Sequence, residues 1–399
     1  MVMIQSSEQP QTFVPTATTL AALLACGIFV TIGLFSPGLV LPQMAMAFSS
    51  TPSALLLSEL TGTIAGFSFA LSAPFCGALV GRRGCRQVIL PGLVLFAVFG
   101  VLPAALDNLW LIVIARFLLG IATAAVFTAA LAGIGTMAPH IRAKMFGWFS
   151  VVGGVAAIIL FPIVGQLGHF GWRPAFLVHL TSLAVLPLAL AIPASLGRRP
   201  RAVDTMQADQ GVPRWNRAML GILLISALAG MGMILSPMYG PIYLASLGLT
   251  DTRFVAIPLM IGAAAAVLGS AAYGVANRIF GIRGIFIAAG SLMGTALIVA
   301  GLTRNIIVFS AAIAGMSAMV ALLSPNLNAA AVHYNRPERA AQAIGLTNGM
   351  MFGAQLLFPF LAAAARAHLG ISGVFLAFGV VIVAAALLMT TMRPPTPTG

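Results

Sequence analysis

Apolar residues occur in long blocks, and short gaps rich in Gly, Pro and Arg separate them. A helix that crosses the hydrocarbon core of a bilayer needs about 20 mostly apolar residues. The pattern therefore predicts an all-α membrane protein with twelve transmembrane helices, in which the longest polar gap, 197–217, separates two sets of six. The predicted spans are approximately 18–42, 54–80, 88–106, 109–136, 145–167, 175–196, 218–247, 254–276, 285–302, 306–332, 341–364 and 374–392.

The same gap predicts the domain organisation. Residues 1–196 would form an N-terminal six-helix bundle, 197–217 a cytoplasmic linker, and 218–399 a C-terminal six-helix bundle. The apolar run that begins near residue 18 follows a polar stretch with no basic segment, and no cleavage site stands out after it. We therefore expect a retained helix rather than a signal peptide.

The basic residues predict the orientation in the membrane, because cytoplasmic loops carry an excess of Lys and Arg. With both termini in the cytoplasm, the external loops would hold only Arg173, Arg253, Arg304 and Arg366. The cytoplasmic loops would hold Arg82, Arg83, Arg86, Arg142, Lys144, Arg198, Arg199, Arg201, Arg214, Arg217, Arg278, Arg283, Arg336, Arg339 and Arg393. This asymmetry predicts a multi-pass protein of the cytoplasmic (inner) membrane with both ends inside.

The two sets of helices also resemble each other in sequence. A shift of 197 positions places RAKMFGWFSVVGGVAAIILFP (142–162) on RAAQAIGLTNGMMFGAQLLFP (339–359), so that both segments begin with Arg-Ala and end with Leu-Phe-Pro. A shift of 200 places Ser36-Pro37 on Ser236-Pro237. The repeat predicts two homologous halves in parallel orientation, a plan found in one large class of transporters. At the offset of 197, Gly77, Gly84 and Arg86 fall on Gly274, Gly281 and Arg283.

Composition narrows the class of protein. Of 399 residues, 60% are apolar and 7% are charged, and the mean hydropathy is +1.06, whereas soluble domains carry about 25% charged residues. The net charge of +13 comes from arginines scattered through loops rather than from a basic helix face, so we expect no nucleic-acid partner. We find no nucleotide-binding motif and no metal-ligand pair, and therefore predict no cofactor.

Several motifs resemble the major facilitator superfamily over essentially the whole chain. The signature loop of that family, Gly-x-x-x-Asp-Arg-x-Gly-Arg-Arg, corresponds to GALVGRRGCR, in which Gly77, Arg82, Gly84 and Arg86 match and Gly81 replaces the Asp. The resemblance implies a conformational role for this loop, and the missing Asp puts in doubt the contact by which it helps to lock the outward-facing state.

Two further motifs resemble the drug:proton antiporter branch of the family. Arg116-Phe117-Leu118-Leu119-Gly120 matches its Arg-Phe-x-x-Gly, and Gly153-Gly154 with Pro162 partly matches its glycine-rich fifth helix. Small residues allow close packing of helices in lipid, and Pro162 with its repeat partner Pro359 can kink the fifth and eleventh helices. Such kinks suit halves that rock about a cavity, although both prolines could equally be tolerated packing features.

Arg116 lies about seven residues inside the span 109–136, where an ionised side chain is costly and needs a partner. Glu59 lies at a similar depth in the span 54–80, so we predict a Glu59–Arg116 pair that couples transport to protons or contacts the substrate. Two structural alternatives stay open. Glu59 could be a solvated residue at a helix end, and Arg116 could bind backbone carbonyls of the first helix.

Other polar residues at membrane depth are candidates for the lining of a central cavity. Tyr239 and Tyr243 could present one aromatic face beside an interruption at SPMYGP (236–241), and the alternative is a packing role. His179 titrates in a useful range, although a lone histidine is more often a hydrogen-bonded structural residue. Asn326 and Asn328 cannot share a helix face, so at most one would line the cavity. The predicted lining residues are Tyr239, Tyr243, Asn326, Asn348 and His179.

Together these features predict a secondary active transporter, a monomer in the bilayer, that moves small organic solutes by alternating access. The first hypothesis is proton-coupled efflux of amphipathic compounds, because the apolar, methionine-rich spans suit loosely specified substrates. The alternative is uptake of a small organic anion by symport, with Arg116 binding the carboxylate. We do not expect an enzyme, because a membrane enzyme would need a nucleophile–base set or metal ligands, and a sensor would need a larger soluble domain.

Overall fold

A computed structural model of the protein describes residues 15–198, 217–335 and 340–391, and it is helical nearly throughout. The helices of the N-terminal half correspond to the first six predicted spans. They are α1 (Ala17–Ala25), α2 (Ile28–Phe35), η1 (Gly38–Val40), α3 (Leu41–Ala47), α4 (Ala54–Arg83), α5 (Cys85–Val101), η2 (Leu102–Ala105), α6 (Leu109–Gly135), α7 (Pro139–His169), η3 (Pro174–Leu180) and α8 (Thr181–Ala189).

The C-terminal half follows the predicted linker, most of which lies outside the described residues. Its helices are α9 (Arg217–Ile234), η5 (Leu235–Tyr239), α10 (Gly240–Ser246), α11 (Thr252–Ala271), α12 (Tyr273–Leu302), α13 (Ile306–His333), α14 (Ala340–Gly353), η7 (Ala354–Leu356) and α15 (Phe358–Thr391).

Within the described ranges, ten helices are long and apolar enough to cross a membrane, against the twelve predicted spans. The difference has two causes. The sixth span is a shorter apolar helix over Pro174–Ala189. The eleventh span is divided among α14, η7 and the start of α15, and α15 continues into the twelfth span across a non-helical residue, Gly370, with φ of 69°.

The repeat predicted from sequence has a structural counterpart at two glycines. Gly84, with φ of 92°, separates α4 from α5, and Gly281, with φ of 62°, breaks the helix within α12. A positive φ is accessible to glycine without the steric cost that a side chain would add. The two residues are related by the offset of 197, so both halves turn the chain with the same residue at the same place.

The first and seventh spans are both interrupted at the repeated Ser-Pro pair. Ser36-Pro37 lies between α2 and the 3₁₀ turn η1, and Ser236-Pro237 lies within η5, a π-helical turn. Proline removes one helical hydrogen bond and disfavours regular continuation of the helix. The predicted interruption at 236–241 therefore occurs, and a matching one occurs in the first span.

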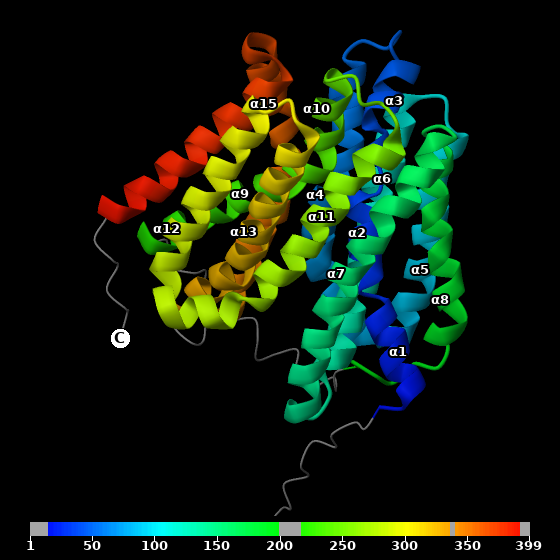
Figure 1. Ribbon diagram of the computed structural model, residues 1–399. Coiled ribbons are helices and arrows are strands. Elements are labelled where there is room, and N and C mark those ends of the chain that lie inside the picture. Colours follow the sequence, from blue (N-terminus) through cyan, green and yellow to red (C-terminus); the bar gives the residue numbers. More distant parts are fainter. Residues whose placement is uncertain (1–14, 199–216, 336–339, 392–399) are drawn as a thin grey trace, which may run out of the picture.

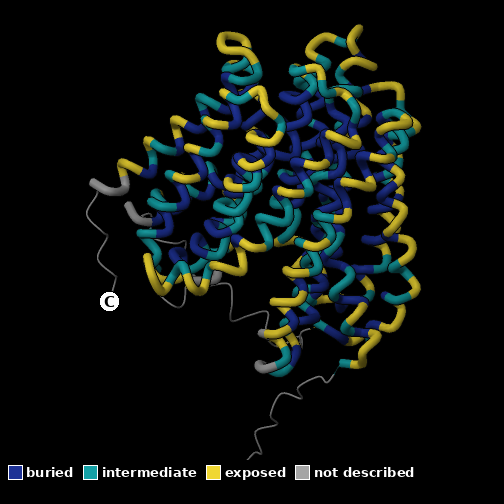
Figure 2. Tube along the Cα trace, in the orientation of Figure 1, coloured by how far each residue is buried: buried dark blue, intermediate teal, exposed yellow. Residues whose placement is uncertain are grey.

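The two halves lie side by side, converge at one end of the bundle and diverge at the other (Figure 1). We call the converging end the Arg-poor end, because it carries the loops 48–53, 106–108, 170–173, 247–251 and 303–305. We call the opposite end, near Gly84, residues 136–138 and Gly281, the Arg-rich end. Buried residues concentrate where the helices pack together, and exposed ones lie on the outer faces, as Figure 2 shows.

Close contacts at glycine residues join the two halves near the Arg-poor end. A Cβ atom on Gly38 would lie 1.9 Å from the carbonyl oxygen of Pro237, and one on Gly62 would lie 2.4 Å from Sδ of Met238. On the other side of the interface the Thr252 hydroxyl donates to the Gly165 carbonyl at 2.6 Å. The closed end is therefore held by contacts in which glycine hydrogens meet the partner half directly.

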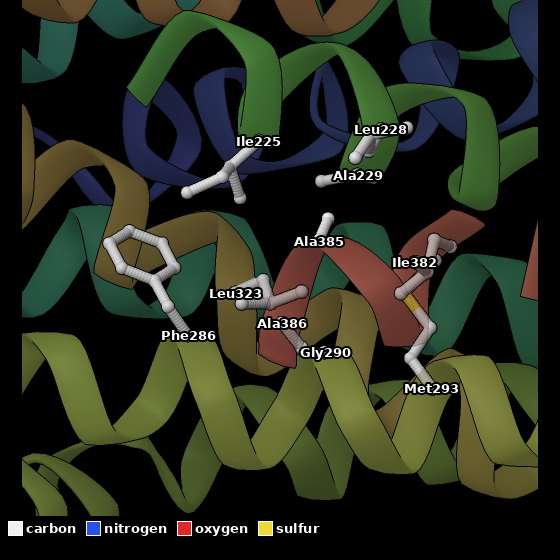
Figure 3. Close-up of a pocket in the computed structure, with 10 residues that line it drawn as sticks. All are labelled: Ile225, Leu228, Ala229, Phe286, Gly290, Met293, Leu323, Ile382, Ala385 and Ala386. Carbon is white, nitrogen blue, oxygen red and sulfur yellow. The ribbon is translucent and has the colours of Figure 1, made fainter. Parts of the chain in front are cut away.

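The C-terminal half also encloses a small apolar gap of about 30 Å³ between α9, α12, α13 and α15 (Figure 3). Its wall includes Ile225, Phe286 and Met293, and every lining residue is apolar. A dry space of this size, with no polar group to hold a ligand, is a packing defect rather than a binding site.

Candidate functional site

A cavity of about 700 Å³ lies between the two halves. Its size falls within the range of pockets that enclose drug-sized ligands. None of its described lining residues is Asp, Glu, Lys, Arg or His. The lining comprises Phe35, Phe69, Ala70, Ala73, Pro74, Phe127, Thr128, Leu131, Ser150, Ala157, Phe161, Gly232, Met233, Ser236, Pro237, Leu259, Gly262, Ala263, Ala266, Met316, Ser317, Val320, Ala321, Ser324, Asn328, Gly345, Asn348, Gly349, Met351 and Phe352.

The cavity is displaced toward the Arg-rich end of the bundle. On α6 the lining residues are 127–131, within a few residues of the last residue, Gly135, and on α13 they extend to Asn328, near the end of that helix at His333. On α4 the lining begins only at Phe69, fifteen positions after Ala54. At 1.5 Å per residue, more than 20 Å of that helix separates the cavity from the Arg-poor end.

The N-terminal half contributes most of the aromatic wall. Phe69 packs edge-on against Phe127, with ring centroids 5.5 Å apart, and against Phe352 of the other half at 5.3 Å. Phe35 and Phe161 complete this surface. Sequence reasoning did not select these phenylalanines, because a Phe in an apolar span has no feature that separates cavity lining from lipid contact.

The C-terminal half contributes a polar wall in which two amides meet. The Asn348 side-chain nitrogen donates to Oδ1 of Asn328 at 3.1 Å and to the Ile344 carbonyl at 3.0 Å. Ser317, Ser324 and Asn328 also line the cavity and recur at seven- and four-residue spacing along α13, so they share one helix face. That spacing is the sequence signal that could have identified this wall.

Asn348 thus lies where it was predicted, whereas the other predicted lining residues lie elsewhere. Asn326 is fully buried, and its nitrogen donates to the Ile282 carbonyl at 2.9 Å, so the cavity-facing asparagine of this pair is Asn328. Tyr243 donates to the Thr303 carbonyl at 2.6 Å and stacks on Phe309, which is the packing alternative. Tyr239 and His179 are also buried away from the cavity.

Glu59 forms an ion pair across the two halves, near the Arg-poor end. Its carboxylate is fully buried and pairs with the guanidinium of Arg366 on α15, whose side chain is 21% exposed. The hydroxyl of Tyr239, in η5, donates to the second carboxylate oxygen at 3.4 Å. We call these three residues the Glu59 cluster. All described partners of the Glu59 side chain thus belong to the opposite half.

The predicted Glu59–Arg116 contact is therefore wrong, because Glu59 pairs with Arg366. The alternative, in which Glu59 is a solvated residue at a helix end, is also wrong, because the carboxylate is fully buried. The structure also moves Arg366, which was assigned to an external loop, into a helix. Arg366 was misassigned because Gly370 ends the apolar run near the arginine. The physical reason for the pairing is that α4 faces α15 across the interface, so the carboxylate finds an arginine of the other half.

Arg116 is instead held by neutral acceptors within its own half. Its Nε donates to the Thr61 carbonyl at 3.0 Å, Nη2 donates to the Gly33 carbonyl, and Nη1 lies 3.4 Å from Nε2 of His179. Arg116 is fully buried and does not line the cavity. The structural alternative, in which Arg116 binds carbonyls of the first helix, therefore describes its environment, extended to α4 and to His179.

The tautomer of His179 follows from its contacts. Its Nδ1 lies 2.8 Å from the Phe176 carbonyl, which can only accept, so Nδ1 carries the proton. Nε2 then accepts from Arg116, and Ser36 lies 3.3 Å from the same nitrogen. His179 is thus a neutral acceptor that helps to fix Arg116 between α2, α4 and α6, which is the structural role left open for it.

The predicted loop motif turns tightly at the Arg-rich end. A Cβ on Gly84 would lie 2.5 Å from the Ala194 carbonyl, and the backbone nitrogen of Cys85 donates to the Leu196 carbonyl at 2.7 Å. Gly77 has open space around its Cα, Arg82 is exposed, and Arg86 is half-buried. The glycine turn is thus explained by packing.

The predicted kinks differ between the two proline sites. The eleventh span breaks at the 3₁₀ turn η7, immediately before Pro359, whereas α7 continues as one helix across Pro162. The adjacent glycines of α7 serve two different interfaces. Thr31 of the same half donates to the Gly153 carbonyl at 3.0 Å, and a Cβ on Gly154 would lie 2.6 Å from Val267 of the other half.

Two repeated helical halves enclose an uncharged, drug-sized cavity and close it at one end, an arrangement typical of membrane transporters. The chain belongs to the Major Facilitator Superfamily, whose family model matches residues 22–348. The predicted fold and family are confirmed, and the chain is a multi-pass membrane protein of that family.

Known proteins with similar sequences include transporters named for different substrates. The gentisate transporter of Corynebacterium glutamicum is 28% identical over 158 residues, which cover 38% of this chain and 35% of that protein. The multidrug resistance protein MdtG of Salmonella paratyphi C is 30% identical over 173 residues, 43% of this chain and 42% of that protein. The aligned regions thus span less than half of either relative.

Solved structures resemble the whole chain at low sequence identity. A D-xylose-proton symporter superposes with a TM-score of 0.75 at 18% identity, covering 94% of this chain and 98% of the symporter. A POT family transporter in complex with 5-aminolevulinic acid superposes with a TM-score of 0.76 at 14% identity, covering 96% and 97% of the two chains. At these identities the likeness shows the fold alone.

Proposed function

We propose that this protein exports small amphipathic compounds across the cytoplasmic membrane, driven by protons that enter in exchange. The observation that carries the proposal is the cavity of about 700 Å³ between the halves, with no ionisable side chain among its described lining residues. Such a surface suits ligands with a large apolar body, because it offers van der Waals contact and few directional constraints.

In this proposal the Arg-rich end faces the cytoplasm, as the distribution of basic residues favours. Both termini then lie in the cytoplasm, and the structure corresponds to an inward-facing state that would accept substrate from the inside or from the inner leaflet. Release outside requires that the contacts at the Arg-poor end separate, including Gly38 against Pro237 and Glu59 against Arg366.

Protons would act at Glu59 in this cycle. The ion pair with Arg366 needs an ionised carboxylate, so protonation of Glu59 removes the attraction that joins α4 to α15. A proton taken up from the outside would therefore stabilise the outward-facing state while substrate leaves, and its release to the cytoplasmic side would restore the ion pair and close the Arg-poor end, so that one proton enters in each cycle. The pair couples protonation to conformation because its two members lie in different halves.

Transport in everted membrane vesicles tests this proposal. Respiration acidifies the vesicle interior, and the loss of the uncharged dye N-phenyl-1-naphthylamine from the membrane is followed by its fluorescence. We expect dye movement that stops on addition of a protonophore, and that Glu59→Gln abolishes. Ser72→Ala is a matched control, because the Ser72 hydroxyl donates to the Ser68 and Phe69 carbonyls of its own helix. Proton-driven movement that persists in Glu59→Gln would remove Glu59 as the coupling site.

A second candidate function is uptake of an organic anion by symport, which the similarity to the gentisate transporter favours. The role first assigned to Arg116 in that function loses its support, because this guanidinium donates to backbone carbonyls and is absent from the cavity lining. Uptake of radiolabelled gentisate by right-side-out vesicles with an inward proton gradient would establish this alternative. We expect no uptake above that of vesicles without the protein.

A further inference from the structure

The two walls of the cavity differ in their unused hydrogen-bonding capacity. In the N-terminal half, the Thr128 hydroxyl donates to the Ala124 carbonyl at 2.6 Å, and the Ser150 hydroxyl donates to the Phe146 carbonyl at 3.1 Å. In the C-terminal half, the hydroxyls of Ser236, Ser317 and Ser324 form no hydrogen bond with any described residue. The polar groups available to a ligand are therefore concentrated on one side.

The amide pair has the same character. Asn348 uses its nitrogen on Asn328 and Ile344, whereas its own side-chain oxygen has no partner among the described residues. The side-chain nitrogen of Asn328 likewise has no described partner. One amide donor and one amide acceptor thus lie next to each other on the cavity wall, a combination that complements an amide, a hydroxyl or another group with both functions.

The opposite wall offers ring faces and edges instead. The Phe127–Phe69–Phe352 series crosses from one half to the other, with centroid distances of 5.5 and 5.3 Å. Aromatic rings favour offset and edge-on contacts with other rings. Met233, Met316 and Met351 of the C-terminal half also line the cavity, and their flexible thioethers can fill the space around ligands of different shape.

The described lining residues include no side chain that could act as a counter-ion to a charged ligand. An ion that leaves water for an apolar site loses its hydration, and this cost is recovered only when an opposite charge or several hydrogen bonds replace the water. A neutral ligand with one polar group loses much less, and the amide pair can replace that part of its hydration.

We infer that the cavity selects ligands that are uncharged when bound, with an aromatic ring system against the phenylalanine wall and one donor–acceptor group against Asn328 and Asn348. This inference rests on the proposed function in one respect, namely that this cavity is the transport site. It narrows the broad class of amphipathic compounds to neutral aromatic amides, alcohols and related molecules.

Binding of four naphthalene probes to the full-length protein in zwitterionic nanodiscs tests the inference, with protein-free nanodiscs as the partition control. The probes are 2-naphthamide, 2-ethylnaphthalene, 2-naphthoate and (2-naphthyl)trimethylammonium, and naphthyl fluorescence at pH 7 reports binding. We expect 2-naphthamide to bind at least about tenfold more tightly than either ion, and about three- to tenfold more tightly than 2-ethylnaphthalene, as a net hydrogen bond allows.

The variant Asn348→Leu separates the amide pair from general hydrophobicity. It should remove the advantage of 2-naphthamide over 2-ethylnaphthalene and leave the affinity for 2-ethylnaphthalene unchanged. Asn348→Gln, which retains an amide, should keep part of the advantage, and Ser72→Ala should keep all of it. Thermal unfolding of each variant establishes that the protein is folded when binding is measured.

Three outcomes would overturn the inference: equal or tighter binding of either ion, an unchanged preference in folded Asn348→Leu, or no binding by any of the four probes. These outcomes are independent of the proposed export. The expected binding pattern without proton-driven dye movement would reject the export proposal and leave the ligand class intact, whereas proton-driven movement without the pattern would do the reverse.

Discussion

Two arginines within the helices of this protein, the fully buried Arg116 and the partly exposed Arg366, find polar partners in different ways. Arg116 is satisfied by backbone carbonyls of α2 and α4 and by neutral His179, all within the N-terminal half. Arg366 is satisfied by the carboxylate of Glu59, which belongs to the other half. An ionised side chain at membrane depth needs polar partners in either case.

The difference lies in what happens when the halves move. A rocking motion of rigid halves leaves the partners of Arg116 in place, so this residue stabilises the N-terminal bundle in every conformation. The same motion separates Arg366 from Glu59, so this pair contributes only when the Arg-poor end is closed. Burial of a charge therefore does not by itself indicate a role in transport; the location of its partners does.

Arg116→Leu should have the largest effect on stability. It removes three hydrogen bonds of the guanidinium, to the Thr61 and Gly33 carbonyls and to Nε2 of His179, and since each loss costs about 1–3 kcal/mol, we expect a loss of about 5 kcal/mol in the free energy of unfolding. Thermal unfolding in detergent and the yield of monodisperse protein measure this. Arg116→Lys should recover only part of the loss, because an ammonium cannot reproduce the planar fork. A wild-type melting temperature in Arg116→Leu would contradict the structural role.

Removal of either partner of the ion pair should instead change the conformation. Glu59→Ala leaves a cation that is 21% exposed, so we expect a smaller loss of about 2–3 kcal/mol and opening of the Arg-poor end. Ser58, which is fully buried beside Glu59, reports that opening after substitution to cysteine. An impermeant maleimide should label Ser58→Cys only when Glu59 or Arg366 is also replaced.

The labelling experiment has two internal controls. Met46→Cys, at a position that is 74% exposed, should react in every background, and the parent protein should react little because Cys26, Cys76 and Cys85 are buried. The double variant Glu59→Ala/Arg366→Met should be more stable than Glu59→Ala alone, because no unpaired charge remains. Equal labelling of Ser58→Cys with and without the ion pair would mean that the ion pair does not hold the Arg-poor end closed.

Tyr239→Phe should open the Arg-poor end less than Glu59→Ala does. It removes one hydroxyl that donates to Glu59 at 3.4 Å, which corresponds to about 1 kcal/mol. We expect slight additional labelling of Ser58→Cys and wild-type folding. An effect as large as that of Glu59→Ala would mean that the hydroxyl, rather than the arginine, controls the carboxylate.

The half-buried acid Asp251, whose side chain is 30% exposed, should show the smallest effect of this series. Hydrogen bonds from the Arg253 side chain lower the pKa of Asp251 to about 2. Because the folded-state pKa lies below the usual value, its contribution to stability is complete above about pH 5 and is lost as the pH falls through about 2. The melting temperatures of wild type and Asp251→Asn should differ slightly and by a constant amount from pH 8 to pH 5. A difference that varies within that range would contradict this assignment of the pH dependence to Asp251.

The fold could be predicted because each step uses information local to the sequence. Apolar run length predicted the spans, and Gly and Pro marked the breaks, as Gly84, Gly281 and the two Ser-Pro pairs show. The prediction placed the sixth span over 175–196, whereas the apolar helix there is shorter, Pro174–Ala189. It also divided α15 at the point where Gly370 interrupts the helix.

The site was predicted only in part, because it depends on contacts between distant helices. Glu59 was identified as a buried acid, but its partner lies 307 positions away in the sequence, and no local pattern relates the two. The choice of Asn326 over Asn328 failed for a different reason, namely helix register. The recurrence of Ser317, Ser324 and Asn328 on one face of α13 indicates that Asn328 faces the cavity. The phenylalanines of the aromatic wall have no comparable pattern in the sequence.

The contact of Gly38 with Pro237 has a consequence for how this protein can evolve. Where the first span meets the seventh, a single methyl group would occupy the space of a carbonyl oxygen 1.9 Å away. At this point the main chains of the two halves are in direct contact, and no flexible side chain lies between them to accommodate a larger residue. A substitution of Gly38 would therefore keep the two halves from closing fully at the Arg-poor end. Substitutions in the cavity lining can change the substrate preference during evolution, whereas position 38 must remain glycine for the closed end to form.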